Sequence, residues 1–172
     1  ARRLQPNPEA ASQEPGACRG GLEGRLEPFA LTARQHVRLV SPAQQERYVR
    51  QGWKITGLEI ILSSLGNEAM LYSKLTPEQT AQAQALAGQA DAEYLLNLPM
   101  PSMSQGQLRL ALLLRAVFAK PKLLLLDEPF DGLDAQARSS VHKLIHAAAQ
   151  QGSTFVCTAH RAKDIPKDTV CG

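Results

Sequence analysis

Residues 103–107 read MSQGQ and residues 123–134 read LLLLDEPFDGLD, and these two stretches together decide the fold. The first leads into apolar residues at helical spacing, Leu108 and Leu112, which predicts a helix that starts near Ser104. The second opens with four leucines, a run suited to a strand that is covered on both faces of a parallel sheet. A helix start with free backbone amides therefore precedes a buried strand that ends in two carboxylates. The pair predicts an anion site beside an acidic sheet edge.

The segment downstream continues the alternation of strand and helix. Asp134 can cap the next helix, and Gly152 can stop it. The apolar stripe of that helix comprises Val141, Leu144, Ile145 and Ala148. Residues 154–159 then have the pattern of a further buried strand. Strand, helix and strand in this order predict a right-handed parallel unit, and therefore an α/β core.

Residues 55–119 are predicted to form an all-helical block. Within it Thr76 is placed as an N-cap, Pro77 occupies the first helical position, and Gln79 can close a capping box. Gly88 is expected to interrupt the helix that starts there, because glycine lowers helix stability. The predicted helix that follows Ser104 closes the block.

The N-terminal part has a different character. Residues 1–29 contain four prolines and four glycines with little apolar periodicity, which predicts poor order. A short strand is expected over residues 35–40, ended by Pro42. The predicted organisation is therefore a poorly ordered segment at 1–34, a strand and its connection at 35–54, the helical block at 55–119, and the rest of the α/β core at 120–172.

Composition narrows the class of protein. The net charge is +3, from 19 basic and 16 acidic residues. No run of basic residues is longer than Arg2-Arg3, so the charge gives no strong indication of nucleic-acid binding. No apolar stretch reaches the roughly 18 residues of a membrane span. Three cysteines without metal-ligand spacing favour a reducing compartment, and we expect a cytoplasmic protein. The chain begins with Ala1 rather than Met, which we interpret as a fragment or a processed chain.

The two opening stretches resemble motifs of one enzyme family. Residues 127–134 closely resemble the Walker B and D-loop motifs of ABC-type ATPases, and residues 103–107 resemble their L-S-G-G-Q signature, with Met103 for the leucine and Gln105 for the first glycine. The resemblance implies an α/β fold, namely an incomplete P-loop NTPase core with parallel strands plus an all-helical signature subdomain. Within the family, the amino-acid sequence of these motifs is similar to that of the molybdenum-transport or photorepair type.

The resemblance implies catalytic roles for three residues. Asp127 would associate with Mg²⁺, and Glu128 would act as general base on the attacking water. His160, which follows the last predicted strand, would be the switch histidine that contacts the γ-phosphate. The plainer readings stay open, because Asp, Glu and Pro also suit an exposed turn and a lone histidine is often a surface residue. The implied cofactors are ATP and Mg²⁺.

Four further residues are implied to act across a dimer. Ser104, Gly106 and Gln107 would face the γ-phosphate of ATP held by a partner, and Asp134 would read the neighbouring active site. The implied partner is a second ABC ATPase domain in a homo- or heterodimer, with room for a transporter or a regulatory partner. Taken alone, Ser104 can equally be an ordinary N-cap serine.

One expected motif does not occur in these residues. No G-x-x-x-x-G-K-[S/T] phosphate loop is present, so this stretch alone is expected to bind ATP poorly and to be inactive. The alternative is a degenerate, non-catalytic module that docks on a competent partner. An SMC-type ATPase lobe ranks last, because residues 30–102 contain no heptad coiled coil. Gln44 and Gln45 are candidates for the family's Q-loop glutamine.

Overall fold

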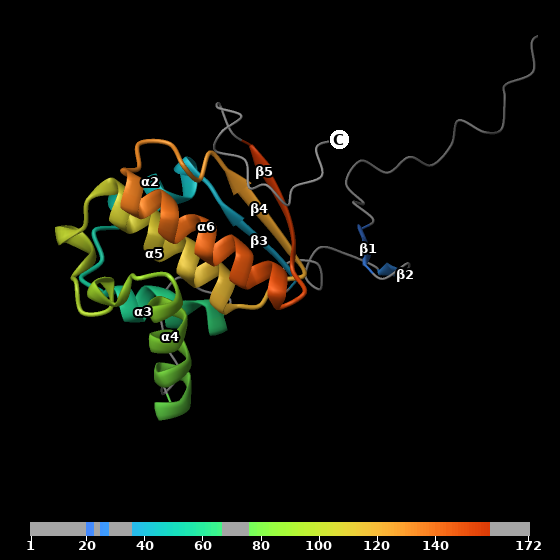
Figure 1. The fold of residues 1–172 in the computed structure, drawn as a ribbon, viewed down its shortest axis with the longest axis horizontal. Helices are drawn as coiled ribbons and strands as arrows, with labels where there is room; N and C mark the ends of the chain where they lie inside the picture. Colours follow the sequence, from blue (N-terminus) through green and yellow to red (C-terminus); the bar gives the residue numbers. More distant parts are fainter. Residues whose placement is uncertain (1–19, 23–24, 28–35, 67–75, 159–172) are drawn as a thin grey trace, which may run out of the picture. The chain divides into compact units, whose positions relative to one another are not determined.

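The computed structural model describes residues 20–22, 25–27, 36–66 and 76–158 (Figure 1). The chain forms two compact units, residues 1–35 and residues 36–172.

The first unit contains a short hairpin. Strand β1 (Gly20–Leu22) pairs antiparallel with strand β2 (Arg25–Glu27). The rest of residues 1–34 lies outside the described residues, so the expected poor order of this segment stays a prediction. An antiparallel pair needs only a short connection and its own backbone hydrogen bonds, so it can form in a segment with few apolar residues.

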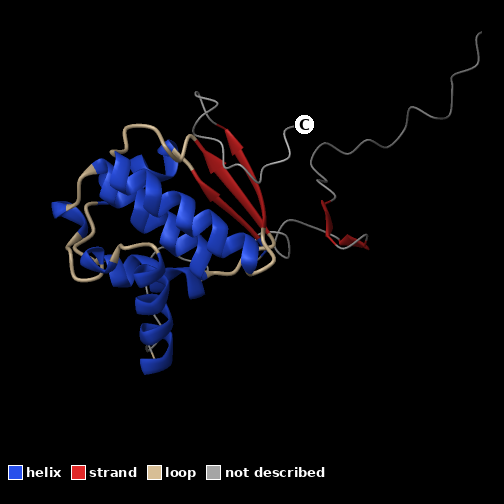
Figure 2. Ribbon diagram, in the orientation of Figure 1, coloured by secondary structure: helices blue, strands red, loops and turns tan. Residues whose placement is uncertain are grey.

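The second unit is built on a three-stranded parallel sheet (Figure 2). Its strands are β3 (Val37–Val40), β4 (Leu123–Asp127) and β5 (Thr154–Thr158), and β4 lies in the centre. Both pairings are parallel, so the predicted α/β core with parallel strands is confirmed. The carboxyl ends of all three strands consequently meet at one edge, where Asp127 pairs with Thr158.

The two faces of this sheet differ in burial. Val40, Leu124 and Leu126 lie on one face and are at most 2% exposed. On the other face Leu39 is 50% exposed and Val156 is 55% exposed, with Leu125 between them in the register. The prediction that the leucine strand is covered on both faces therefore holds on one face only in the part of the chain that the structure describes.

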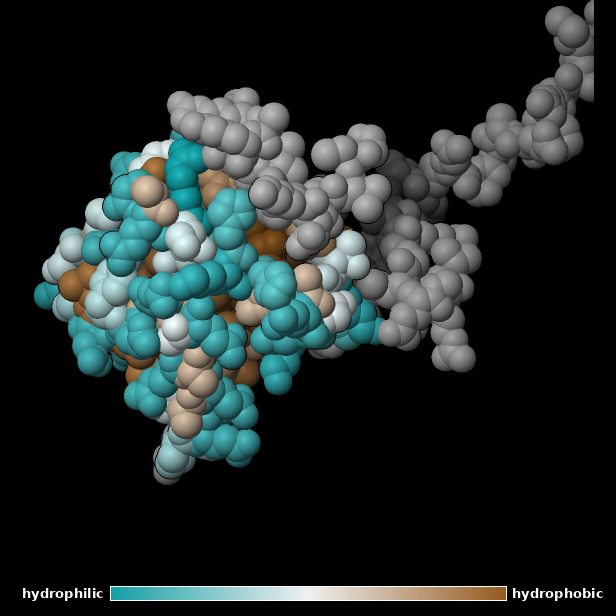
Figure 3. Space-filling view, viewed as in Figure 1, coloured by the Kyte–Doolittle hydropathy of each residue, from teal (hydrophilic) through white to brown (hydrophobic). Residues whose placement is uncertain are grey.

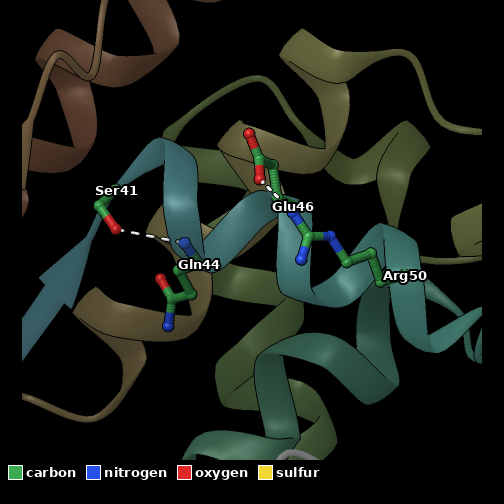
Figure 4. A network of polar contacts seen from close by, with 4 residues as sticks. All are labelled: Ser41, Gln44, Glu46 and Arg50. Atoms are coloured by element: carbon green, nitrogen blue, oxygen red, sulfur yellow. Dashed lines mark hydrogen bonds and ion pairs between the residues drawn. The ribbon is translucent and has the colours of Figure 1, made fainter.

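Helix α2 (Pro42–Gln51) follows β3 directly. Ser41 is its N-cap, and the Ser41 hydroxyl accepts a hydrogen bond from the Gln44 amide at 3.3 Å (Figure 4). Pro42 thus ends the strand as predicted and also starts the helix, where its fixed φ and missing N–H cost nothing. An exposed ion pair between Glu46 and Arg50, at 2.9 Å, lies one turn further along.

The helical block comprises α3 (Gly57–Leu62), α4 (Pro77–Gln89) and α5 (Gln105–Phe118), with short 3-10 turns at Ser63–Leu65, Glu93–Leu95 and Met100–Ser102. The capping box of Thr76 and Gln79 is confirmed. The predicted interruption at Gly88 is wrong, because α4 continues to Gln89. The buried anchors Ala83, Leu86 and Ala87 hold that helix against the core, and this outweighs the cost of one glycine, about 1 kcal/mol.

Helix α5 occupies the centre of the unit. It packs against α3, α4 and strand β3, and against α6 (Ala135–Gln150), which lies beside it (Figure 1). Eight of its residues are buried, so apolar side chains surround most of it. The outer surface over α6 is largely hydrophilic (Figure 3). Among the described residues, no helix has both the length and the apolar character to cross a membrane.

Candidate functional site

The start of α5 presents the first predicted group of site residues. Ser104 is the N-cap: its hydroxyl accepts a hydrogen bond from the Gln107 amide at 3.2 Å, and the Gln107 side chain accepts one from the Ser104 amide at 2.8 Å. This capping box fixes the direction in which the helix begins. Ser104 and Gln105 are exposed, and Gly106 and Gln107 are partly buried. The positive end of a 14-residue helix therefore opens to solvent, as an anion site requires.

A cavity of about 510 Å³ lies at this helix end. Its lining joins residues 104–107 with the turn that follows β4, residues 132–134, and with Tyr94. Three of the residues predicted to face a partner's phosphate, Ser104, Gly106 and Gln107, thus share one cavity with Asp134. Sequence spacing alone did not reveal this meeting, since a strand and a turn separate the two groups.

Asp134 also has a local structural task. Its side chain accepts a hydrogen bond from the Ala137 amide at 2.8 Å and caps α6, which confirms the predicted cap. Tyr94, at the same cavity, is missed by the sequence analysis. Burial raises the pKa of the Tyr94 phenol, and the nearby negative charge of Asp134 raises this pKa further. No sequence motif marks Tyr94, because it reaches the cavity from a 3-10 turn.

The two carboxylates lie at the carboxyl end of β4. Asp127 is exposed, and its Oδ1 accepts a hydrogen bond from the Thr158 hydroxyl at 2.8 Å. The same hydroxyl oxygen accepts a hydrogen bond from the Glu128 amide at 3.0 Å. Thr158 at the end of β5 thus holds both acidic residues in place. Neither acid lines the cavity at the start of α5.

Glu128 has an unusual backbone conformation. Its φ is +51°, in the left-handed region that residues with a Cβ rarely adopt. The turn that begins there is closed by a hydrogen bond from the Asp131 amide to the Glu128 carbonyl at 3.2 Å. A left-handed residue directly after a strand reverses the chain sharply, so it sets where the Glu128 carboxylate stands relative to the sheet edge.

A second missed residue connects the acidic turn to α5. The Arg109 guanidinium donates to the carbonyl oxygens of Glu128 and Asp131. Sequence reasoning could have found Arg109 as the charged residue between Leu108 and Leu110, both of which are buried. A charge in such a position usually has a specific partner.

The remaining candidates have mixed outcomes. Gln45 is buried at 7% exposure, whereas Gln44 is partly buried and its Oε1 has no hydrogen-bond partner among the described residues. His160 lies outside the described residues, so its predicted role stays a prediction. His142 stacks on the buried Phe130 ring with centroids 4.7 Å apart. The described residues contain no group of three metal-ligating side chains.

Comparisons with known proteins agree with these motifs. A family described as "AAA domain, putative AbiEii toxin, Type IV TA system" matches residues 13–161. The ABC transporter ATP-binding protein ModF of Escherichia coli (strain K12) is 27% identical over 135 residues, which cover 77% of this chain and 28% of that protein. The zinc import ATP-binding protein ZnuC of Alkalilimnicola ehrlichii is 39% identical over 94 residues, which cover 52% of this chain and 35% of that protein. The chain spans about a third of these relatives.

Solved structures show the same architecture. The ATP-binding cassette MJ0796, solved as a dimer in a post-hydrolysis state with ADP and Pi, matches with a TM-score of 0.60 at 19% identity, over 83% of this chain and 62% of that chain. The protein cbiO1 of Clostridium perfringens, part of the ABC transporter complex cbiONQ, matches with a TM-score of 0.60 at 20% identity, over 81% of this chain and 54% of that chain. At these identities the likeness concerns the fold.

Proposed function

The chain belongs to the ABC-type ATPases, as a part of their nucleotide-binding domain, and from this membership we propose that it supplies the phosphate-facing and acidic elements of an ATP-hydrolysing module. The reaction is the conversion of ATP and water to ADP and phosphate at the interface of two such domains. One observation carries the proposal: the capped start of α5 and the Asp134 turn share one cavity, and the carboxylate pair lies at the carboxyl end of β4, just before that turn in the chain.

The cavity is suited to the phosphates of a nucleotide that a second domain holds. The first-turn amides of α5 and the positive end of its dipole both favour an anion. Because the Ser104 hydroxyl oxygen already accepts from the Gln107 amide, its own proton is available to donate to a phosphate oxygen. Asp134 at the far wall of the cavity then contacts the partner's site. ModF and ZnuC carry ATP-binding in their names, in line with this proposal.

The acidic end of β4 suits Mg²⁺. The carboxylate of Asp127 is exposed, and the Thr158 hydroxyl donates to the Oδ1 atom of Asp127. The Oδ2 atom of Asp127 has no hydrogen bond to another described residue. Mg²⁺ is usually held by one or two carboxylates together with waters and substrate phosphates, so the lack of a larger ligand cluster in the described part is compatible with such a site. When bound, the ion would neutralise charge on the phosphates.

Glu128 is the proposed general base. It follows directly after Asp127, the residue proposed to associate with Mg²⁺. The left-handed backbone conformation of Glu128 directs its side chain differently from that of Asp127. A carboxylate placed next to the attacking water can accept its proton while the water oxygen bonds to the γ-phosphorus and ADP departs. His160 is proposed to contact that phosphate. The module is proposed to act in the cytoplasm as a dimer, in association with a transporter or regulatory partner.

The proposal is tested on the full-length protein that carries this chain. Glu128→Gln is expected to lower ATP turnover by at least about a hundredfold and to trap an ATP-bound dimer, seen by size-exclusion chromatography. Hydrolysis at the unaltered rate would refute Glu128 as the base. Absence of turnover in the unaltered protein would overturn the proposal and favour the non-catalytic docking module.

The two capping boxes that a glutamine closes, at the starts of α4 and α5, provide a matched control for the phosphate-facing role. Ser104→Ala and Thr76→Ala each remove an N-cap hydroxyl with a glutamine at the third helical position, and each should cost about 1 kcal/mol of stability. Only Ser104→Ala should also weaken the ATP-trapped dimer. Equal effects of the two variants on dimerisation would contradict the proposed contact between Ser104 and phosphate.

A further inference from the structure

Arg109 and Gln45 form a polar network between α2 and α5. The Gln45 side chain is nearly buried, and its Nε2 donates to the Gln105 carbonyl at 2.9 Å. Its Oε1 accepts from the Arg109 Nε at 3.1 Å. The amide of Gln45 is thus used at both ends, and it ties α2 to two successive turns of α5.

The other edge of the Arg109 guanidinium reaches the acidic turn. Its Nη1 donates to the Glu128 carbonyl at 3.4 Å and also to the Asp131 carbonyl. These two carbonyls bracket the turn, which the bond from the Asp131 amide to the Glu128 carbonyl closes. A single planar side chain therefore connects three segments: the helix after β3, the start of α5 and the turn after β4.

We propose that Arg109 is a positioning residue that sets the Glu128 carboxylate relative to the phosphate-facing end of α5, and that Gln45 transmits the position of α2 to it. Glu128 has the left-handed φ of +51°, a conformation that persists only where neighbouring groups hold it. The guanidinium donates to the carbonyl of this residue from outside the turn. The inference rests on the proposed role of Glu128 as general base.

The network also explains how a change at α2 can reach the carboxylate. The bonds from Gln45 to Gln105 and to Arg109 link residues that are 60 and 64 positions apart in the sequence. If α2 moves away from α5, the Nε of Arg109 loses its acceptor, and the guanidinium can rotate away from the two carbonyls. The acidic turn then loses the two hydrogen bonds that it accepts from α5, and the Glu128 carboxylate shifts from the geometry that proton transfer requires.

The test uses steady-state ATP hydrolysis by the full-length protein. Arg109→Lys keeps the charge but loses the planar fork that serves three acceptors, so kcat should fall about tenfold to a hundredfold. The KM for ATP should stay nearly unchanged, because Arg109 does not line the phosphate-facing cavity. Gln45→Met should lower kcat less, and it should cause no further decrease in the Arg109→Lys background, since both act through one network.

Arg115→Lys is the matched control. Arg115 is on the same helix and donates to the Ser63 hydroxyl at 2.8 Å, away from the acidic turn. The Arg115→Lys substitution should change the midpoint of urea unfolding by about as much as Arg109→Lys does, and it should leave kcat unchanged. An unchanged kcat in Arg109→Lys, or equal losses of kcat in both lysine variants, would overturn the inference.

A parallel Glu128→Gln measurement separates this inference from the proposed function. If Glu128→Gln abolishes turnover and Arg109→Lys does not change kcat, only the positioning role is refuted. If Glu128→Gln leaves turnover unchanged, the proposed function fails, and the positioning role fails with it. If the losses of kcat multiply in the Gln45→Met, Arg109→Lys double variant, only the transmission from α2 through Gln45 is refuted.

Discussion

Gly106 and Leu133 approach each other so closely that a Cβ on Gly106 would lie 3.0 Å from the Leu133 Cδ2 atom. Gly106 belongs to the first turn of α5, and Leu133 to the turn after β4, where it is 8% exposed. A Cβ here would make the Leu133 side chain shift by a few tenths of an ångström, so close packing favours glycine at this position, whose helical conformation is itself open to any residue. Through this contact the phosphate-facing helix end and the D-loop-like turn are held in one arrangement.

Gly106→Ala is expected to weaken ATP turnover of the full-length protein by about tenfold, because the methyl group pushes Leu133 and with it the neighbouring wall of the cavity. Stability should change little, since the helical gain of alanine offsets part of the crowding. Steady-state hydrolysis and urea unfolding measure the two effects. Leu133→Val in the same chain should restore part of the turnover; failure of this rescue would show that crowding against Leu133 is not the cause.

Gly57→Ala is expected to destabilise the unit by about 3 kcal/mol, because a Cβ at Gly57 would meet the backbone oxygen of Leu95 at 2.1 Å. That backbone cannot give way easily: the Gly57 amide donates to the Leu98 carbonyl at 3.1 Å, and the Leu58 amide to the Leu96 carbonyl at 2.9 Å. The midpoint of urea unfolding measures the loss.

Gly88→Ala is the control for this experiment. A Cβ at Gly88 meets only the flexible end of Glu93, at 3.1 Å, and the position lies inside α4. Alanine should therefore stabilise the unit by about 0.5–1 kcal/mol. A loss of stability at Gly88 as large as that at Gly57 would mean that the close approach at Leu95 does not explain the effect.

The thiol of Cys157 is expected to react slowly. Burial raises its pKa above the ordinary value, so at pH 8 the thiolate fraction is smaller than that of an exposed cysteine. In a Cys18→Ser, Cys171→Ser background, alkylation by iodoacetamide at pH 8 should be about tenfold slower in the native state than in urea. The native rate should keep rising past the pH at which the rate in urea levels off. Equal rates in the native and unfolded states at pH 8 would contradict this expectation.

Much of the local structure could be predicted from the sequence. The cap at Thr76, the cap at Asp134 and the strand that ends at Asp127 all occur where the pattern indicated. The two caps depend on residues three apart, whose hydrogen bonds form within one helical turn, and the strand is marked by its run of four leucines. The interruption at Gly88 failed because burial of the helix against the core is a tertiary effect, which single-residue propensity does not contain.

What the sequence by itself determined is therefore the set of elements, the parallel order of the core and the positions of Ser104, Asp127 and Glu128 at element ends. The tertiary structure alone decided which of these ends meet. It brought Asp134 and Tyr94 to the cavity at the start of α5, and it linked Gln45 through Arg109 to the acidic turn. The physical reason is range: caps are satisfied by neighbours in the chain and a strand is marked by its local run of apolar residues, whereas contacts across sixty positions exist only after the apolar faces of several elements have packed together.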